Sequence, residues 1–118
     1  MKKIVAIILL FVGFAFTANA QKVKTVSLEQ TKGEFTQKKI TLSEGTYVFE
    51  IANNNVGHNV GFVLAPISDV KKHIKNAYVK KAVANNTKGT SNKVTLKKGT
   101  YVYFCPLNPT PQYTLVVE

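Results

Sequence analysis

Apolar and polar residues alternate over most of the chain from residue 22 to its end. This pattern covers residues 22–30, 35–42 and 46–53, with a turn at residues 43–46. A further apolar run, 58–66, closes at a proline, and residues 92–105 and 112–118 complete the β-rich part. A period of two is typical of strands that bury one face. The sequence therefore predicts an all-β domain.

One segment departs from this alternation and predicts a helix. Residues 67–85 carry apolar side chains three and four positions apart, which is the period of a helix with one buried face. Ser68 or Asp69 would provide the N-cap. We therefore expect one helical insertion between strands, with these apolar positions on its buried face: Ile67, Val70, Ile74, Tyr78, Val79 and Val83.

An internal similarity indicates how the strands are connected. Residues 39–51 match residues 93–105 at an offset of 54, with seven identical positions. Each copy reads as a strand, a tight turn containing glycine and a second strand, which resembles a hairpin. Two such halves would close the core of a Greek-key β-sandwich. Similar turn chemistry that arose independently is the alternative explanation.

The first twenty residues have the features of a signal peptide. Lys2 and Lys3 precede a short apolar stretch, and Ala18-Asn19-Ala20 forms a cleavage site before Gln21. The apolar stretch is too short to favour a stable membrane span. We therefore expect residues 1–20 to be a signal peptide, residues 21–118 to form one domain, and the mature protein to be periplasmic or secreted.

The charge of the chain bears on its partners. Its sixteen basic residues are all lysines, against six acidic residues, and the formal net charge is +10. Nucleic-acid binding usually depends on arginine for bidentate contacts, so the absence of arginine argues against that class of partner. A basic surface favours an acidic protein partner. The sequence does not determine the oligomeric state.

Cys105 is the only cysteine, so the chain cannot form an internal disulfide. An unpaired thiol in an oxidising compartment is expected to be buried, bonded to a partner or bound to a metal. The simplest alternative is a small apolar residue of the core. His58, which opens an apolar run, is a candidate second ligand because loops at one end of a sandwich bring distant residues together.

The two segments that carry these residues resemble a known family. GHNVGF (57–62) and GTYVYFCP (99–106) are similar to the first and second copper-ligand segments of the cupredoxins, the blue-copper family of plastocyanin and azurin. The resemblance implies a Greek-key sandwich, a type 1 copper site and transfer of single electrons. It further implies that His58 and Cys105 bind copper, and that Asn59 ties the two ligand loops together by hydrogen bonds.

The loop after Cys105 departs from the family pattern. Asn108 stands where a histidine is expected, no methionine follows, and no histidine occurs after Cys105. Gln112 is a candidate weak axial ligand, or Tyr113 if the loop aligns one residue further on. We assign His73 to the surface because it lies in a lysine-rich segment. The expected metal ligands are therefore His58, Cys105, Asn108 and Gln112.

These observations predict an exported copper-binding protein with one mononuclear site. It would bind one copper ion, as Cu(I) or Cu(II), and would carry electrons or hold copper, with a redox or copper-handling protein as its partner. Two strong ligands suffice for Cu(I). The alternative is a metal-free binding module with a degenerate copper site. Catalysis is not expected: a Cys105–His58 dyad would lack an orienting acid and an oxyanion hole.

Overall fold

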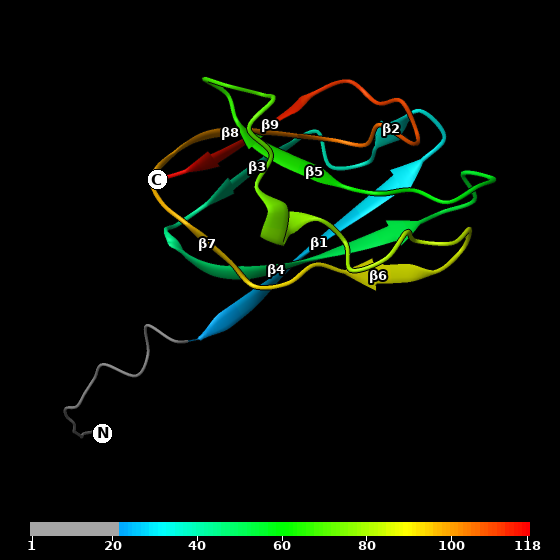
Figure 1. Ribbon diagram of the computed structural model, residues 1–118, viewed down its shortest axis with the longest axis horizontal. Helices are drawn as coiled ribbons and strands as arrows, with labels where there is room; N and C mark the ends of the chain where they lie inside the picture. Colours follow the sequence, from blue (N-terminus) through cyan, green and yellow to red (C-terminus); the bar gives the residue numbers. More distant parts are fainter. Residues whose placement is uncertain (1–21) are drawn as a thin grey trace, which may run out of the picture.

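The computed structural model describes residues 22–118, which form two β-sheets packed face to face (Figure 1). This architecture confirms the prediction of an all-β sandwich. The strands are β1 (Val23–Thr31), β2 (Glu34–Phe35), β3 (Lys39–Leu42), β4 (Gly45–Asn53), β5 (Val63–Pro66), β6 (Lys88–Thr90), β7 (Val94–Leu96), β8 (Gly99–Phe104) and β9 (Tyr113–Val117).

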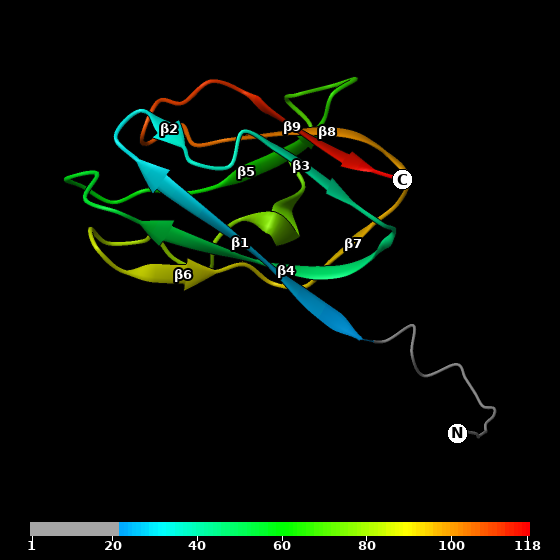
Figure 2. The same cartoon turned by 180° about the vertical axis from the view of Figure 1, so that it is seen from behind.

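The first sheet has the order β2-β1-β4-β6, and β7 also pairs with β4; the second sheet has the order β3-β9-β8-β5. β1 runs parallel to β4, and β3 runs parallel to β9. The remaining pairs are antiparallel. Seen from behind, β1 crosses the sandwich diagonally and ends beside β2 (Figure 2). β1 and β2 of the first sheet therefore meet at the end of the sandwich at which β1 finishes.

Two of the predicted strands are shorter than expected. The run 35–42 divides into β2, which pairs with β1, and β3, which pairs with β9 in the other sheet. The run 58–66 is a strand only over β5, and its first part makes one isolated bridge, between Val60 and Val83. Residues 58–62 therefore take their position from packing and individual hydrogen bonds rather than from a sheet ladder.

Four buried aromatic rings join the sheets beneath this irregular segment. Phe35 of β2, Phe49 of β4, Phe62 and Tyr103 of β8 are each at most 2% exposed. The ring of Phe35 meets that of Tyr103 edge to face at 5.2 Å, and the rings of Phe49 and Phe62 lie 5.1 Å apart. Each such pair adds about 0.5–1.5 kcal/mol beyond the burial of its area. Phe62 thereby anchors residues 58–62 to the core.

The two similar segments do not form hairpins, so that interpretation is wrong, but they do share a structure. β3 and β4 lie in different sheets, and so do β7 and β8, so each copy crosses from one sheet to the other. Tyr47 donates its hydroxyl to the carbonyl of Ser43 at 2.7 Å, and Tyr101 donates to that of Lys97 at 2.8 Å. The repeated tyrosine therefore stabilises the same kind of crossing twice.

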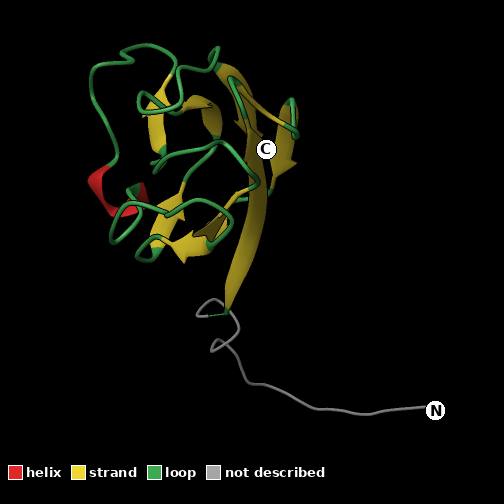
Figure 3. Ribbon diagram, turned by 90° about the vertical axis from the view of Figure 1, so that its right-hand side faces the viewer, coloured by secondary structure: helices red, strands yellow, loops and turns green. Residues whose placement is uncertain are grey.

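The predicted helix over residues 67–85 is also wrong. Its only helical part is the single turn η4 (Lys75–Ala77), at the side of the sandwich (Figure 3). The backbone N–H of Ile74 donates to the carbonyl of Leu64, and Val83 and Val60 exchange two backbone hydrogen bonds. The β-branched residues of this segment lose little in an extended chain. Of the described residues, none belong to a helix long and apolar enough to span a membrane.

The segment that replaces the helix packs closely on β6 at Gly89. A Cβ atom at Gly89 would lie 2.8 Å from Cγ2 of Val83. We predict that Gly89→Ala lowers the free energy of unfolding by about 1–3 kcal/mol, measured by urea denaturation, because overpacking strains both chains. In a chain that already carries Val83→Ala, the further change Gly89→Ala should cost less unfolding free energy than it does in the wild type, because the clashing methyl group is gone.

Gly45→Ala is the matched control for this prediction. The nearest atoms to a Cβ atom there would be those of the Tyr47 side chain, beginning at 3.7 Å, which is an ordinary contact distance. We expect a change in unfolding free energy within about 0.5 kcal/mol. Equal losses in Gly45→Ala and Gly89→Ala would contradict close packing against Val83 as the cause.

Burial of the Tyr103 phenol has a pH-dependent consequence. Desolvation, followed by repulsion from Tyr113, raises the pKa of Tyr103 from 10.0 to about 12. The folded state therefore keeps its proton where the unfolded chain loses it, and the associated stability is complete below pH about 10 and is lost as the pH rises towards about 12. We predict a flatter decline in stability over this range for Tyr103→Phe, measured by urea denaturation. An equally steep decline in the variant would contradict it.

Candidate metal centre

The loops that carry the expected ligands lie at one end of the sandwich. The loop between β4 and β5 contains His58, and the loop between β8 and β9 contains Cys105, Asn108 and Gln112; both lie at the right-hand end of the molecule in Figure 1. The fold thus places the two segments that carry the candidate ligands at the same end of the sandwich. The side chains within these loops differ greatly in their surroundings.

Cys105 is fully buried and its sulfur accepts two hydrogen bonds. The backbone N–H of Gly61 lies 3.3 Å from Sγ, and that of Asn108 lies 3.2 Å from it. The backbone N–H of Cys105 donates to Oγ1 of Thr110 at 3.0 Å, and this hydroxyl donates to the carbonyl of Pro111. The sulfur is therefore held between two backbone donors from different loops.

The side chain of Asn108 is directed away from the sulfur. Asn108 is 2% exposed, and its Nδ2 donates to the carbonyl of Thr31 at 2.9 Å and to Oε1 of Gln30 at 3.1 Å. Its Oδ1 accepts the backbone N–H of Gly33 at 2.7 Å. The amide oxygen and nitrogen are thus both engaged by β1 and the turn that follows it. Asn108 reaches Cys105 only through its backbone N–H.

Gln30 is a residue of this centre that the sequence analysis missed. It is fully buried on β1, and its Nε2 donates to the carbonyl of Gly61 at 2.8 Å. Its amide therefore joins Gly61 to Asn108, the two residues whose N–H groups contact the sulfur. A signal was available: Gln30 alternates with Val26 and Leu28 on the inward face of β1, where a polar side chain needs a partner.

His58 is exposed, and no contact between it and Cys105 is present in the structure. Its Nδ1 lies 2.9 Å from the carbonyl oxygen of Asn59, and its own carbonyl accepts Nδ2 of Asn53 at 2.8 Å. Three residues separate His58 from Gly61, so their Cα atoms are at most about 11 Å apart. His58 therefore lies in the same loop as Gly61, which donates to the sulfur. Within residues 22–118, no hydrogen bond from the Asn59 side chain ties the ligand loops.

The other candidates lie outside a common cluster. Gln112 is exposed, and its side chain has no hydrogen bond within the described part of the chain. Nδ1 of His73 lies 2.8 Å from the hydroxyl of Tyr78, and its ring packs edge to face on Phe104. No three His, Cys, Asp or Glu side chains of residues 22–118 are grouped so as to hold a metal ion.

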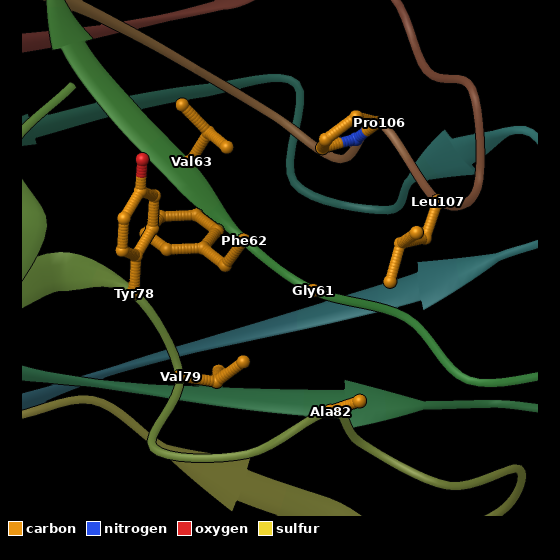
Figure 4. A pocket seen from close by; sticks show the side chains of 8 residues that line it. All are labelled: Gly61, Phe62, Val63, Tyr78, Val79, Ala82, Pro106 and Leu107. Atoms are coloured by element: carbon orange, nitrogen blue, oxygen red, sulfur yellow. The ribbon is translucent and has the colours of Figure 1, made fainter.

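An apolar hollow of about 320 Å³ lies beside Gly61 and Pro106 (Figure 4). Pro106 and Leu107, which follow the cysteine, form one side of it, and Gly61 lies between them and the opposite wall. The Leu107 side chain is 54% exposed. The opposite wall and floor are Phe62, Val63, Tyr78, Val79 and Ala82.

The donor set fits a copper ion of low coordination number. The buried thiol of Cys105 offers a soft donor, and the imidazole of His58 lies in a loop at the same end of the sandwich. Thiolate and imidazole suit Cu(I), whereas a type 1 site requires two imidazoles and a thiolate. The only other histidine is His73, which is bonded to Tyr78. The residues therefore fit Cu(I) held by two strong ligands, but not a standard type 1 site.

Comparisons with known proteins agree with the fold. The profile of a family described as copper binding proteins, plastocyanin/azurin family, matches residues 21–116. No curated protein sequence matches the chain. Auracyanin A, a "blue" copper protein from Chloroflexus aurantiacus, has a TM-score of 0.63 at 18% identity, over 82% of this chain and 100% of its own.

Two further solved structures show the same likeness. The azurin Az-iso2 from Methylomonas sp. strain J has a TM-score of 0.57 at 19% identity, over 80% of this chain and 97% of its own. Amicyanin from Paracoccus versutus has a TM-score of 0.52 at 14% identity, over 80% of this chain and 81% of its own. At these identities the likeness shows a shared fold.

Proposed function

Because the chain belongs to the plastocyanin/azurin family of copper-binding proteins, we propose that it is an exported protein that holds one copper ion through Cys105 and His58. The observation that carries this proposal is the setting of the Cys105 sulfur. Two backbone N–H groups, one from each of two loops, point at this sulfur, and buried hydrogen bonds hold both loops in place. The proposal extends the family relationship to particular residues of this chain.

Cys105 would be the anchoring ligand. A sulfur that accepts two N–H groups has donors in place for the negative charge of a thiolate, and thiolate is the form that binds metal. Its loop is rigid because Cys105 and Thr110 exchange hydrogen bonds and because Pro106, Pro109 and Pro111 restrict the backbone. A preorganised thiolate binds metal without first ordering its surroundings.

His58 would be the second ligand, and the two weaker candidates differ in their roles. The exposed His58 imidazole has no side-chain partner in the described part of the chain, which leaves Nε2 available. The amide of Asn108 is engaged elsewhere, so Asn108 would act through its backbone N–H. Gln112 remains the candidate for a weak oxygen ligand because its amide is exposed.

Electron transfer and copper holding make different demands on this site. Bound copper would supply one-electron redox chemistry. The ligand set of one thiolate and one imidazole favours Cu(I), so we propose copper holding or delivery ahead of rapid electron transfer. The lysine-rich mature chain, with a net charge of +8 once Lys2 and Lys3 are removed, would favour an acidic redox or copper-handling partner.

The test is a copper titration of the reduced chain from residue 21 to residue 118. We predict that it binds one Cu(I) in competition with a chromogenic chelator and by native mass spectrometry. Cys105→Ser should lower the affinity more than about 100-fold, because losing even an outer partner of a ligand costs 10–100-fold. His58→Gln should lower it about 10-fold or more, whereas the control His73→Gln should leave it unchanged.

The outcomes separate the possible functions. An intense thiolate-to-copper band after loading with Cu(II), absent in Cys105→Ser, would indicate a redox-capable site. Tight and colourless Cu(I) binding would indicate holding or delivery. Absence of binding, or equal binding by wild type and Cys105→Ser, would overturn the proposal in favour of a metal-free module with a degenerate copper site.

Export is proposed from residues 1–20, which lie outside the described residues. Cleavage after Ala20 would leave Gln21 as the first residue of a periplasmic or secreted protein and would lower the net charge from +10 to +8. We predict that intact mass analysis of the exported fraction gives a chain beginning at Gln21. An uncut chain confined to the cytoplasm would contradict export.

A further inference from the structure

We infer that Gln30 is a positioning residue that holds both N–H donors against the sulfur of Cys105. The contacts form a closed circuit, here called the Cys105 ring, made of Gln30, Gly61, Cys105 and Asn108. Gln30 binds Gly61 and Asn108 through the two ends of its amide, and both of these residues donate a backbone N–H to Sγ. No other residue described in the structure links the two donor segments directly in this way.

The orientation of both amides in the Cys105 ring is fixed by the backbone. The carbonyl of Gly61 can only accept, so the nitrogen of the Gln30 amide must face it, which leaves Oε1 towards Asn108. The carbonyl of Thr31 can only accept and the N–H of Gly33 can only donate, so the Asn108 amide has one possible orientation. Each amide thus reinforces the orientation of the other.

Burial makes this arrangement stringent. Gln30 is 0% exposed and Asn108 is 2% exposed, so water cannot substitute for a lost partner. An unsatisfied buried polar group costs about 1–3 kcal/mol, whereas satisfied groups make a rigid network. A shift of Gly61 away from the sulfur would break the Gln30 hydrogen bond to its carbonyl. The position of one N–H donor is thereby coupled to that of the other.

Gln30 would act on copper binding by holding the donors of the sulfur, and this effect on copper affinity rests on the proposed function. Gln30 lies on β1, in the first sheet, whereas Cys105 directly follows β8 of the second sheet. The Cys105 ring therefore fixes the sulfur relative to both sheets. Without Gln30, the carbonyl of Gly61 would lose its buried partner, and β1 would no longer hold the Gly61 N–H against the sulfur.

The first experiment follows the metal-free protein by amide hydrogen exchange. Gln30→Met keeps the length of the side chain but removes both hydrogen bonds. We expect protection of the Gly61 and Asn108 amides to fall at least about 10-fold relative to that of Val83, which lies outside the Cys105 ring. Asn108→Ala retains its backbone N–H, so loss of protection at Gly61 in this variant would reveal coupling through Gln30.

Ser91→Ala is the matched control. Ser91 is 1% exposed, and its hydroxyl accepts the N–H of Phe49 and donates to the carbonyl of Asn92, away from the Cys105 ring. Its loss should lower protection at Phe49 while leaving Gly61 and Asn108 unchanged relative to Val83. If Ser91→Ala lowers protection of the Gly61 amide, relative to Val83, as much as Gln30→Met does, Gln30 contributes only to overall stability. That result would overturn the inference.

The second experiment measures Cu(I) affinity of the same variants with a chelator. We expect Gln30→Met and Asn108→Ala to bind about 10–100-fold more weakly than wild type, and Ser91→Ala to bind normally. Selective loss of amide protection without copper binding by wild type would support the ring and refute the copper function. Normal copper binding by wild type with unchanged Gly61 and Asn108 protection in Gln30→Met would support the function and refute the ring.

Discussion

Two backbone N–H groups converge on the sulfur of Cys105, and the surrounding end of the sandwich depends on that convergence. The donors belong to residues outside the strands, where no ladder of hydrogen bonds fixes the backbone. Their positions come instead from Phe62 in the core and from the buried amides of Gln30 and Asn108. Aromatic packing and fully paired buried polar groups therefore fix the position of the sulfur.

The sequence was informative where a pattern is local. Alternation identified most of the strands, and the position of Cys105 after an apolar run placed it at the end of a strand. Local patterns could not predict the Cys105 ring, because Gln30 lies 31 residues from Gly61 and 78 residues from Asn108 in the sequence. The alternation of β1 shows that Gln30 is buried, but only the fold shows which groups it meets.

Both errors in the fold arose from local patterns with more than one tertiary solution. Residues 67–85 have helical spacing, yet some of their backbone donors find distant partners: Ile74 donates to Leu64 of β5, and Val83 donates to Val60 of the irregular segment. A strand, a tight turn and a second strand likewise describe either a hairpin or a crossing between sheets. The hydrogen bonds of Tyr47 and Tyr101 to carbonyls four residues earlier accompany the crossing, and their spacing is visible in the sequence.

The Cys105 ring also has a consequence for folding. Its contacts join the first strand of the described chain to the loop before the last one, across separations of 31, 44 and 78 residues. Closing the long segments between such distant residues costs conformational entropy, which the contacts of the ring must offset. The ring is therefore complete only when β1 lies beside both loops that donate an N–H group to the sulfur.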